Sequence, residues 1–241
     1  MTMLSFIIPA HNEEGELPET LRALRAAAEE GGQPYEVIVV DDASTDNTRA
    51  IAESFGARVI AADYRQIAAV RNAGARAARG DVFFFVDADT QIAAVHIKGA
   101  LRALEDGAAG GGARLELTGS VPRYGRILAR VFCTIYFAAK LGAGAFLFTT
   151  RETFERIGGF DEQYFAGEEI FFTRALKEVG RFELLSFPVR TSARKLRMNG
   201  GSYMLRQILM LGFSGERALR SRKRLAIWYD GRREAAPAEQ V

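Results

Sequence analysis

The feature that most constrains the fold is a run of five large apolar residues, Val82-Phe83-Phe84-Phe85-Val86, followed at once by Asp87-Ala88-Asp89. An unbroken run of β-branched and aromatic residues of this length indicates a buried strand. Two carboxylates spaced by one residue point to the same side if the strand geometry continues through them. Because a carboxylate is costly to bury alone, this pair needs a cation, a hydroxyl or water. A divalent cation carrying a nucleotide diphosphate would satisfy both acids.

The first half of the chain alternates strand-like and helix-like segments, which predicts an α/β fold with a Rossmann-like, mostly parallel sheet and helices on both faces. Strands are expected at Leu4–Pro9, Glu36–Val40, Val59-Ile60 and Val82–Val86, and helices follow from Leu17, Asp46 and Gln66. In the second half we expect a loop over Gly107–Gly112, strands over Ala113–Thr118, Ala145–Thr149 and Arg181–Val189, and helices over Tyr124–Ala139 and Glu169–Val179.

Composition bounds the class of protein. The chain has 241 residues, 48% of them hydrophobic and 26% charged, with a net charge of +2. These values are typical of a soluble globular domain, and the small charge gives no reason to expect a nucleic-acid partner. Cys133 is the single cysteine, which excludes an intrachain disulfide and suits a reducing cytoplasm. We expect a cytoplasmic protein without a signal peptide or a transmembrane helix, because Lys140 interrupts the most apolar stretch.

Polar clusters follow three of the predicted strands. They are Pro9-Ala10-His11-Asn12-Glu13-Glu14, then Asp41-Asp42-Ala43-Ser44-Thr45-Asp46, then Asp87-Ala88-Asp89. Ligands of parallel sheets bind at the carboxyl ends of strands, so these clusters predict a nucleotide site. Asn12 and the Asp41-Asp42 pair can hydrogen-bond a base and a ribose. The alternative for the first two clusters is plain turn and helix-cap chemistry.

Two later segments complete the set of candidate residues. Arg71, in Arg71-Asn72-Ala73-Gly74, lies in an Ala-rich helix. It either reaches a diphosphate, bridges the acidic strand ends, or is a solvated surface residue. Gly158-Gly159-Phe160-Asp161-Glu162 precedes Glu168-Glu169 at a helix start. A helix N-terminus favours an ionised carboxylate, as a general base requires, although the same acids also suit simple capping.

In this order, the six motifs resemble the GT-A glycosyltransferases of family 2, over about residues 3 to 190. The resemblance implies the GT-A fold and a nucleotide-sugar donor. It implies that Pro9, Asn12 and Glu13 line the nucleotide pocket, that Asp41 and Asp42 contact base and ribose, and that Arg71 approaches the nucleotide or braces the site. Asp87 and Asp89 would form the DxD motif. Asp89 would be the ligand of Mn²⁺ or Mg²⁺, and Asp87 would contact the ribose more than the metal.

The resemblance also implies an inverting displacement in which Glu169 takes a proton from an acceptor hydroxyl. Family members more often have Asp there, which leaves Glu168 or Glu169 as the base. The Gln-x-x-Arg-Trp sequence of processive members is absent, so transfer of a single sugar is expected. Ala43 replaces a common glycine, and we expect a negative φ there. Thr191-Ser192-Ala193-Arg194-Lys195 is similar to a basic segment that faces the diphosphate in some members.

Two other classes remain open: a nucleotidyltransferase of similar fold and a non-catalytic nucleotide-binding protein. We expect two parts in the chain: a catalytic domain over 1–200 and an amphipathic, basic helical extension over 201–241. Apolar residues and arginines mix over Tyr203–Trp228, which indicates either a helix on anionic lipid or one packed on the catalytic domain. A membrane-surface contact would suit a lipid-linked acceptor. A glycan or a small molecule is the other acceptor class.

Overall fold

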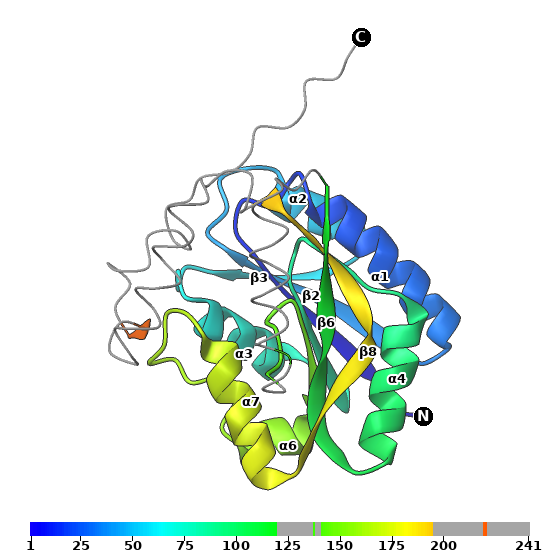
Figure 1. Ribbon diagram of the computed structural model, residues 1–241. Coiled ribbons are helices and arrows are strands. Elements are labelled where there is room, and N and C mark those ends of the chain that lie inside the picture. Colours follow the sequence, from blue (N-terminus) through cyan, green and yellow to red (C-terminus); the bar gives the residue numbers. More distant parts are fainter. Residues whose placement is uncertain (120–136, 138–140, 195–218, 221–241) are drawn as a thin grey trace.

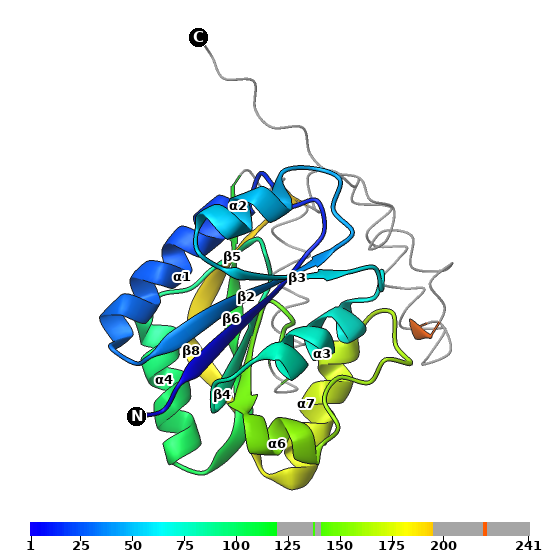
Figure 2. The same cartoon turned by 180° about the vertical axis from the view of Figure 1, so that it is seen from behind.

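The computed structural model describes residues 1–119, 137, 141–194 and 219–220. These residues form a single eight-stranded sheet with helices on both faces (Figure 1 and Figure 2). Its elements in chain order are β1 (Leu4–Ala10), α1 (Leu17–Gly31), β2 (Tyr35–Asp42), α2 (Thr48–Ser54), β3 (Arg58–Ala62), α3 (Ile67–Ala77), β4 (Val82–Val86), β5 (Thr90–Gln91), α4 (Ala94–Glu105), β6 (Ala108–Thr118), β7 (Phe146–Thr150), α6 (Arg151–Arg156), α7 (Glu168–Val179) and β8 (Arg181–Ser192).

The sheet has the strand order β3-β2-β1-β4-β7-β6-β8-β5. Strands β3, β2, β1 and β4 are parallel, β7 runs antiparallel to both β4 and β6, and β6 is parallel to β8. The short strand β5 pairs antiparallel with β8. This arrangement confirms the predicted α/β class with a mostly parallel sheet. The apolar run of the sequence is β4, between β1 and β7.

Alternate side chains of β4 enter two different apolar layers, as the strand period of two requires. Phe84 packs with residues of α1, α2 and α4, and its ring lies 5.0 Å from that of Phe6. Phe83 and Phe85 enter the layer covered by α3, α6 and α7, where the Phe85 ring meets Phe160 edge-on at 4.9 Å. Burial on both faces explains why the run carries no polar residue.

The expected loop over Gly107–Gly112 is wrong, because Ala108–Gly112 form the first part of strand β6. The glycines suit close packing rather than a turn. A Cβ at Gly110 or Gly112 would lie within 3 Å of a β7 carbonyl oxygen, and one at Gly111 would overlap Glu183 O and the Phe148 ring. Small residues therefore let β6 fit between β7 and β8 beneath the aromatic side chains.

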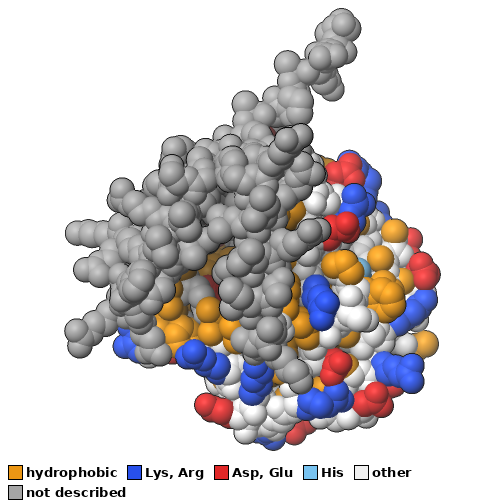
Figure 3. Space-filling view, in the orientation of Figure 1, with side chains coloured by type: hydrophobic (Ala, Val, Ile, Leu, Met, Phe, Trp, Pro, Cys, Tyr) orange, Lys and Arg blue, Asp and Glu red, His pale blue; other side chains and the backbone are white. Residues whose placement is uncertain are grey.

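The other predicted elements of the described residues are confirmed within a few residues, from Gln66–Arg79 as α3 to Glu169–Val179 as α7. Helices α4 and α6 and strand β5 were not anticipated. The helix predicted over 124–139 lies outside the described residues except for Phe137, and of the predicted extension 201–241 only Leu219 and Arg220 are described. No helix in the described part of the chain is long and apolar enough to cross a membrane. On the face in Figure 3, acidic and basic side chains intersperse across the described surface.

Candidate functional site

The strand-end clusters meet at one edge of the sheet. Strands β1, β2 and β4 are parallel neighbours, so the residues after Ala10, Asp41-Asp42 and Asp87 all lie at their carboxyl ends. Pro9 is part of β1 itself, opposite Val40 of β2. The structure therefore brings together the acids that the sequence places far apart.

Asn12 ties the loop after β1 to the loop after β2. Its backbone N–H donates to Ser44 Oγ at 3.0 Å, and its side-chain oxygen accepts the Thr45 N–H at 2.7 Å. The expected negative φ at Ala43 is wrong, since its φ is +57°. That conformation costs an alanine about 1–2 kcal/mol. It is held by the hydrogen bonds on either side of it, including Ser44 N–H to Asp41 Oδ1 at 3.1 Å.

Asp41 and Asp42 are both buried, at 8% and 6% exposure. Asp42 Oδ1 accepts the backbone N–H groups of Tyr64 at 2.7 Å and Arg65 at 3.1 Å. These bonds shape the surrounding loops, as the turn interpretation of the cluster requires. A carboxylate has about four acceptor positions, so both acids keep capacity for a base or a ribose.

Glu13 forms a two-pronged ion pair with Arg194, both oxygens lying 2.9 Å from the guanidinium nitrogens. Its backbone N–H also donates to Thr48 Oγ1 at 2.7 Å. Burial opposes the charged form of Arg194, but hydrogen bonding to Glu13 and nearby acids, including Asp89, raise its pKa above the ordinary value. Arg194 of the basic segment therefore joins the end of β8 to the loop after β1.

Arg71 is the buried centre of the site, with a side chain only 2% exposed. Its Nη2 lies 2.8 Å from Asp87 Oδ1 and 3.0 Å from Gly144 O, and its Nη1 lies 2.5 Å from Glu168 Oε1. Desolvation opposes its charge, but the charges of Asp87 and Glu168 outweigh it and raise its pKa. A Cβ at Gly144 would lie 2.8 Å from Nη2, so a larger residue there would displace the guanidinium. Arg71 thus bridges Asp87 and Glu168, and it is not a solvated surface residue.

Glu168 and Glu169 begin helix α7 but have different surroundings. Glu168 is 4% exposed and bonded to Arg71. Desolvation, followed by repulsion from Glu168, raises the pKa of Glu169 to about 8, against the lowering effects of a backbone hydrogen bond and Arg71. Glu168 is thus paired with Arg71, whereas Glu169 is the carboxyl whose pKa is raised towards the neutral range.

The two acids of Asp87-Ala88-Asp89 contact different partners. Strand β4 ends at Val86, and the Thr90 N–H donates to Asp87 O at 3.0 Å in the turn that follows. Asp87 pairs with Arg71, while Asp89 Oδ1 accepts from Thr191 Oγ1 at 3.4 Å. The two carboxylates were expected to point to the same side only if strand geometry continued through Asp87 and Asp89, and it does not. Ala88 O, between them, accepts from Thr20 Oγ1 of α1 at 2.8 Å.

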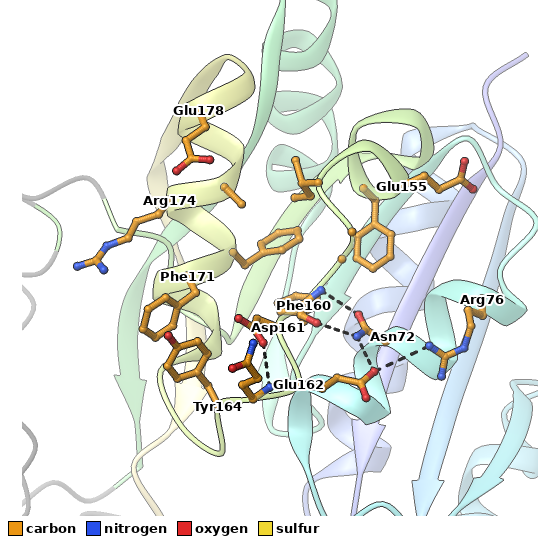
Figure 4. A pocket seen from close by; sticks show the side chains of 17 residues that line it. Asn72, Arg76, Glu155, Phe160, Asp161, Glu162, Tyr164, Phe171, Arg174 and Glu178 are labelled. Carbon is orange, nitrogen blue, oxygen red and sulfur yellow. Dashed lines mark hydrogen bonds and ion pairs between the residues drawn. The ribbon is translucent and has the colours of Figure 1, made fainter. Parts of the chain in front are cut away.

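Asn72 joins the Gly158–Glu162 segment to α3, a role the sequence did not reveal. Its side chain exchanges two hydrogen bonds of 2.9 Å with the backbone of Phe160 and donates to Glu162 Oε1 at 2.9 Å. A pocket of about 950 Å³ opens beside this contact, between α3, α6 and α7 (Figure 4). Phe160, which lines the pocket, also has its ring centre 5.3 Å from the Arg71 guanidinium. The segment is therefore part of the wall behind Arg71.

The family model described as glycosyl transferase family 2 matches residues 5–160. A relative from Pseudomonas aeruginosa, named undecaprenyl-phosphate 4-deoxy-4-formamido-L-arabinose transferase, is 41% identical over 97 residues, which are 37% of this chain and 28% of the relative. A relative of the same name from Serratia proteamaculans is 38% identical over 112 residues, 43% of this chain and 34% of the relative. The matches thus span about a third of each relative's length.

Two solved structures share the fold. S. aureus TarS 1–349 in complex with UDP has a TM-score of 0.61 at 21% identity, over 80% of this chain and 61% of that one. The mannosyltransferase PcManGT from Pyrobaculum calidifontis, in complex with GDP-Man and Mn²⁺, also has a TM-score of 0.61, at 22% identity over 97% of this chain and 65% of that one. Both similarities confirm the predicted GT-A fold.

Proposed function

Because the chain belongs to glycosyl transferase family 2, we propose that it transfers one sugar from a nucleoside-diphosphate sugar to an acceptor hydroxyl, with inversion at the anomeric carbon. The observation that carries this proposal is the buried Arg71 bridge. Through it, Asp87 at the donor-side strand end and Glu168 beside the candidate base form one connected site. A site that only bound a nucleotide would not need Glu168 and Glu169, at the start of α7, to be connected to Asp87 through Arg71.

The strand-end loops supply the donor side of the proposed site. Pro9, Asn12 and Glu13 line the nucleotide pocket, and Asp41 and Asp42 accept hydrogen bonds from base and ribose. The loops are held in shape by their own bonds to one another, including Asn12 to Ser44 and Thr45. Such preorganisation reduces the conformational entropy lost when a donor binds.

A divalent cation fits the oxygen ligands of this site. Among the described residues, no group of three or more His, Cys, Asp or Glu side chains is placed to hold a metal. Mg²⁺ and Mn²⁺ sites, however, need only one or two carboxylates when substrate phosphates supply further ligands. Asp89 would hold the ion, with Asp87 beside it or on the ribose. When bound, such an ion offsets negative charge on the departing diphosphate.

Glu169 acts as the general base in the proposed transfer. Its carboxylate takes the proton of the acceptor hydroxyl while that oxygen attacks the anomeric carbon. The bond from the anomeric carbon to the diphosphate oxygen breaks, and its electron pair leaves with the nucleoside diphosphate. Arg71 keeps Glu168 paired and holds Asp87, which fixes the base relative to the donor side. No step requires a covalent enzyme intermediate.

A phosphate acceptor is the second candidate, favoured by the relatives named for undecaprenyl phosphate. A phosphate monoester has a second pKa near 6 and is already anionic at neutral pH, so it needs no base. A lipid-linked acceptor would place the reaction at the cytoplasmic face of a membrane. Contact through 203–228 stays a prediction, because those residues, apart from 219–220, lie outside the described part of the chain. We expect transfer to a short-chain polyprenyl phosphate to survive loss of Glu169 if this candidate is right.

We predict that Asp89→Ala abolishes the stabilisation that a donor gives in the presence of Mn²⁺. A ligand present at 100 times its dissociation constant stabilises a protein by about 2.7 kcal/mol, which produces a thermal shift of several degrees. A panel of UDP- and GDP-sugars with and without Mn²⁺ measures it. Asp106→Ala, at the exposed end of α4, is the control. A full Mn²⁺-dependent thermal shift in Asp89→Ala would show that Asp89 is not a ligand of the metal.

A further inference from the structure

Leu219 and Arg220, the two described residues of the C-terminal segment, contact the loop that precedes helix α7. Leu219 O accepts the backbone N–H of Phe165 at 2.8 Å. Arg220 Nη2 donates to the Tyr164 hydroxyl at 3.0 Å, and its guanidinium lies 5.0 Å from the centre of the Tyr164 ring. Two residues more than fifty positions along the chain thus contact the loop, Leu219 by a backbone hydrogen bond and Arg220 by a side-chain hydrogen bond and a cation–π contact.

Arg220 is the outer layer of a stack that continues into α7. The Tyr164 ring lies parallel to the Phe171 ring, with centroids 3.6 Å apart and an interplanar angle of 10°. The Arg174 guanidinium lies 5.5 Å from the Phe171 ring (Figure 4 shows Tyr164, Phe171 and Arg174). Tyr164 is only 3% exposed, so its ring is fixed between the loop and the helix. The stack connects Arg220 to the first turns of α7.

The loop itself is anchored on its other side by α3. The side chain of Gln66, which directly precedes that helix, donates to Glu162 O and, at 3.4 Å, to Tyr164 O. Gly167, the N-cap residue of α7, has a left-handed φ of +73°, and Glu168 and Glu169 follow it directly as the first helical residues. A Cβ at Gly167 would lie 3.6 Å from Leu219 Cδ1, so the Leu219 side chain also packs near this turn. Contacts on both sides thus fix where α7 begins.

We infer that Arg220 is a positioning residue, which holds the Tyr164–Gly167 loop and through it sets the place of Glu169. The inference rests on the proposed function, because it assigns the residue a part in the same transfer. Arg220 is exposed, and an exposed cation–π contact contributes only about 0.5–1 kcal/mol to stability. A displacement of 1 Å at a reacting group, by contrast, costs up to about 10²-fold in rate. The effect on catalysis should therefore exceed the effect on folding.

The first test separates kcat from KM in the full chain. Arg220→Ala should lower kcat at least about fivefold and change the donor KM less than about twofold, with little change in thermal stability. Arg220→Lys, which keeps a cation over the ring, should recover part of the loss. Arg102→Ala, an exposed arginine on α4, is the matched control and should match the wild type. An unchanged kcat in Arg220→Ala would overturn the inference.

Hydrogen exchange of the amides over 164–172 separates failure of this inference from failure of the proposed function. Exchange should become faster in Arg220→Ala than in Arg102→Ala, because the Arg220 contacts to Tyr164 no longer hold Leu219 O, the acceptor of the Phe165 N–H, beside the loop. Equal exchange in the two variants would overturn the inference whatever their activity. Faster exchange in a protein whose wild type transfers no sugar would refute the proposed function and the catalytic part of the inference, while the contact itself would stand.

Discussion

Glu169→Gln is expected to lower kcat for transfer to a hydroxyl acceptor by about 10²- to 10⁴-fold, while the donor dissociation constant changes less than about twofold. Glutamine keeps the size of the side chain and its hydrogen-bonding capacity but cannot take the acceptor proton. In the proposed site, donor binding depends on the strand-end loops and Asp89, which this substitution leaves unchanged. Single-turnover rates and donor thermal shifts, measured on the same variant, give the two quantities.

Normal transfer to a hydroxyl by Glu169→Gln would move the base to Glu168 or elsewhere. The pH profile gives a second check. Only ionised Glu169 accepts a proton, so kcat/KM should fall as the pH drops below its pKa of about 8. Repulsion from Glu168 helps to raise that pKa. The acid limb should therefore move to lower pH in Glu168→Gln, and a fixed limb would contradict the assignment.

Arg71→Met should lower the free energy of unfolding by about 3–5 kcal/mol. The guanidinium is the partner of both Asp87 and Glu168, so its removal leaves Glu168 as a buried carboxylate without its counter-charge. Urea unfolding measures the loss. Arg49→Met is the matched control, because the Arg49–Glu53 pair on α2 is exposed and such pairs contribute about 0–1 kcal/mol.

The loss in Arg71→Met should also depend on pH. Arg71 lowers the pKa of Glu169, so its removal raises that folded-state pKa further above about 8, and ionised Glu169 then destabilises the fold more than in the wild type. The deficit should therefore grow as the pH rises above about 8, because at lower pH Glu169 is protonated in both folded proteins. A loss no larger than that of Arg49→Met at pH 8 would show that Arg71 does not hold the site together.

Much of the fold follows from local sequence pattern. The apolar run of β4 and the acids after it are predictable from the residues alone, because periodicity and burial dictate them. The glycines of β6 led to the wrong prediction of a loop. A sequence does not show that Phe148 and Glu183 O require a residue without a side chain at Gly111. Tertiary packing, which a single sequence does not display, decided that segment.

The site divides in the same way. Its acids were predictable from their positions at strand ends, and a bridge from Arg71 to those acids was one of the alternatives, but the more distant partners were not predictable. Arg71 binds Glu168, and Glu13 binds Arg194, across separations of 97 and 181 residues. Arg220 and Tyr164 likewise carried no signal of their contact. Ion pairs of this kind depend on how distant elements meet, and nothing in the local composition of either segment encodes the partner.

The most direct test of the central claim is product analysis of the wild-type chain with Mn²⁺, a panel of nucleotide sugars, and both a saccharide and a short-chain polyprenyl phosphate as acceptors. We expect release of the nucleoside diphosphate and one new glycosidic bond of inverted anomeric configuration. A product on the polyprenyl phosphate alone would select the second acceptor class. A nucleotidyl product with pyrophosphate, or binding of donors without any turnover, would contradict the assignment as a glycosyltransferase.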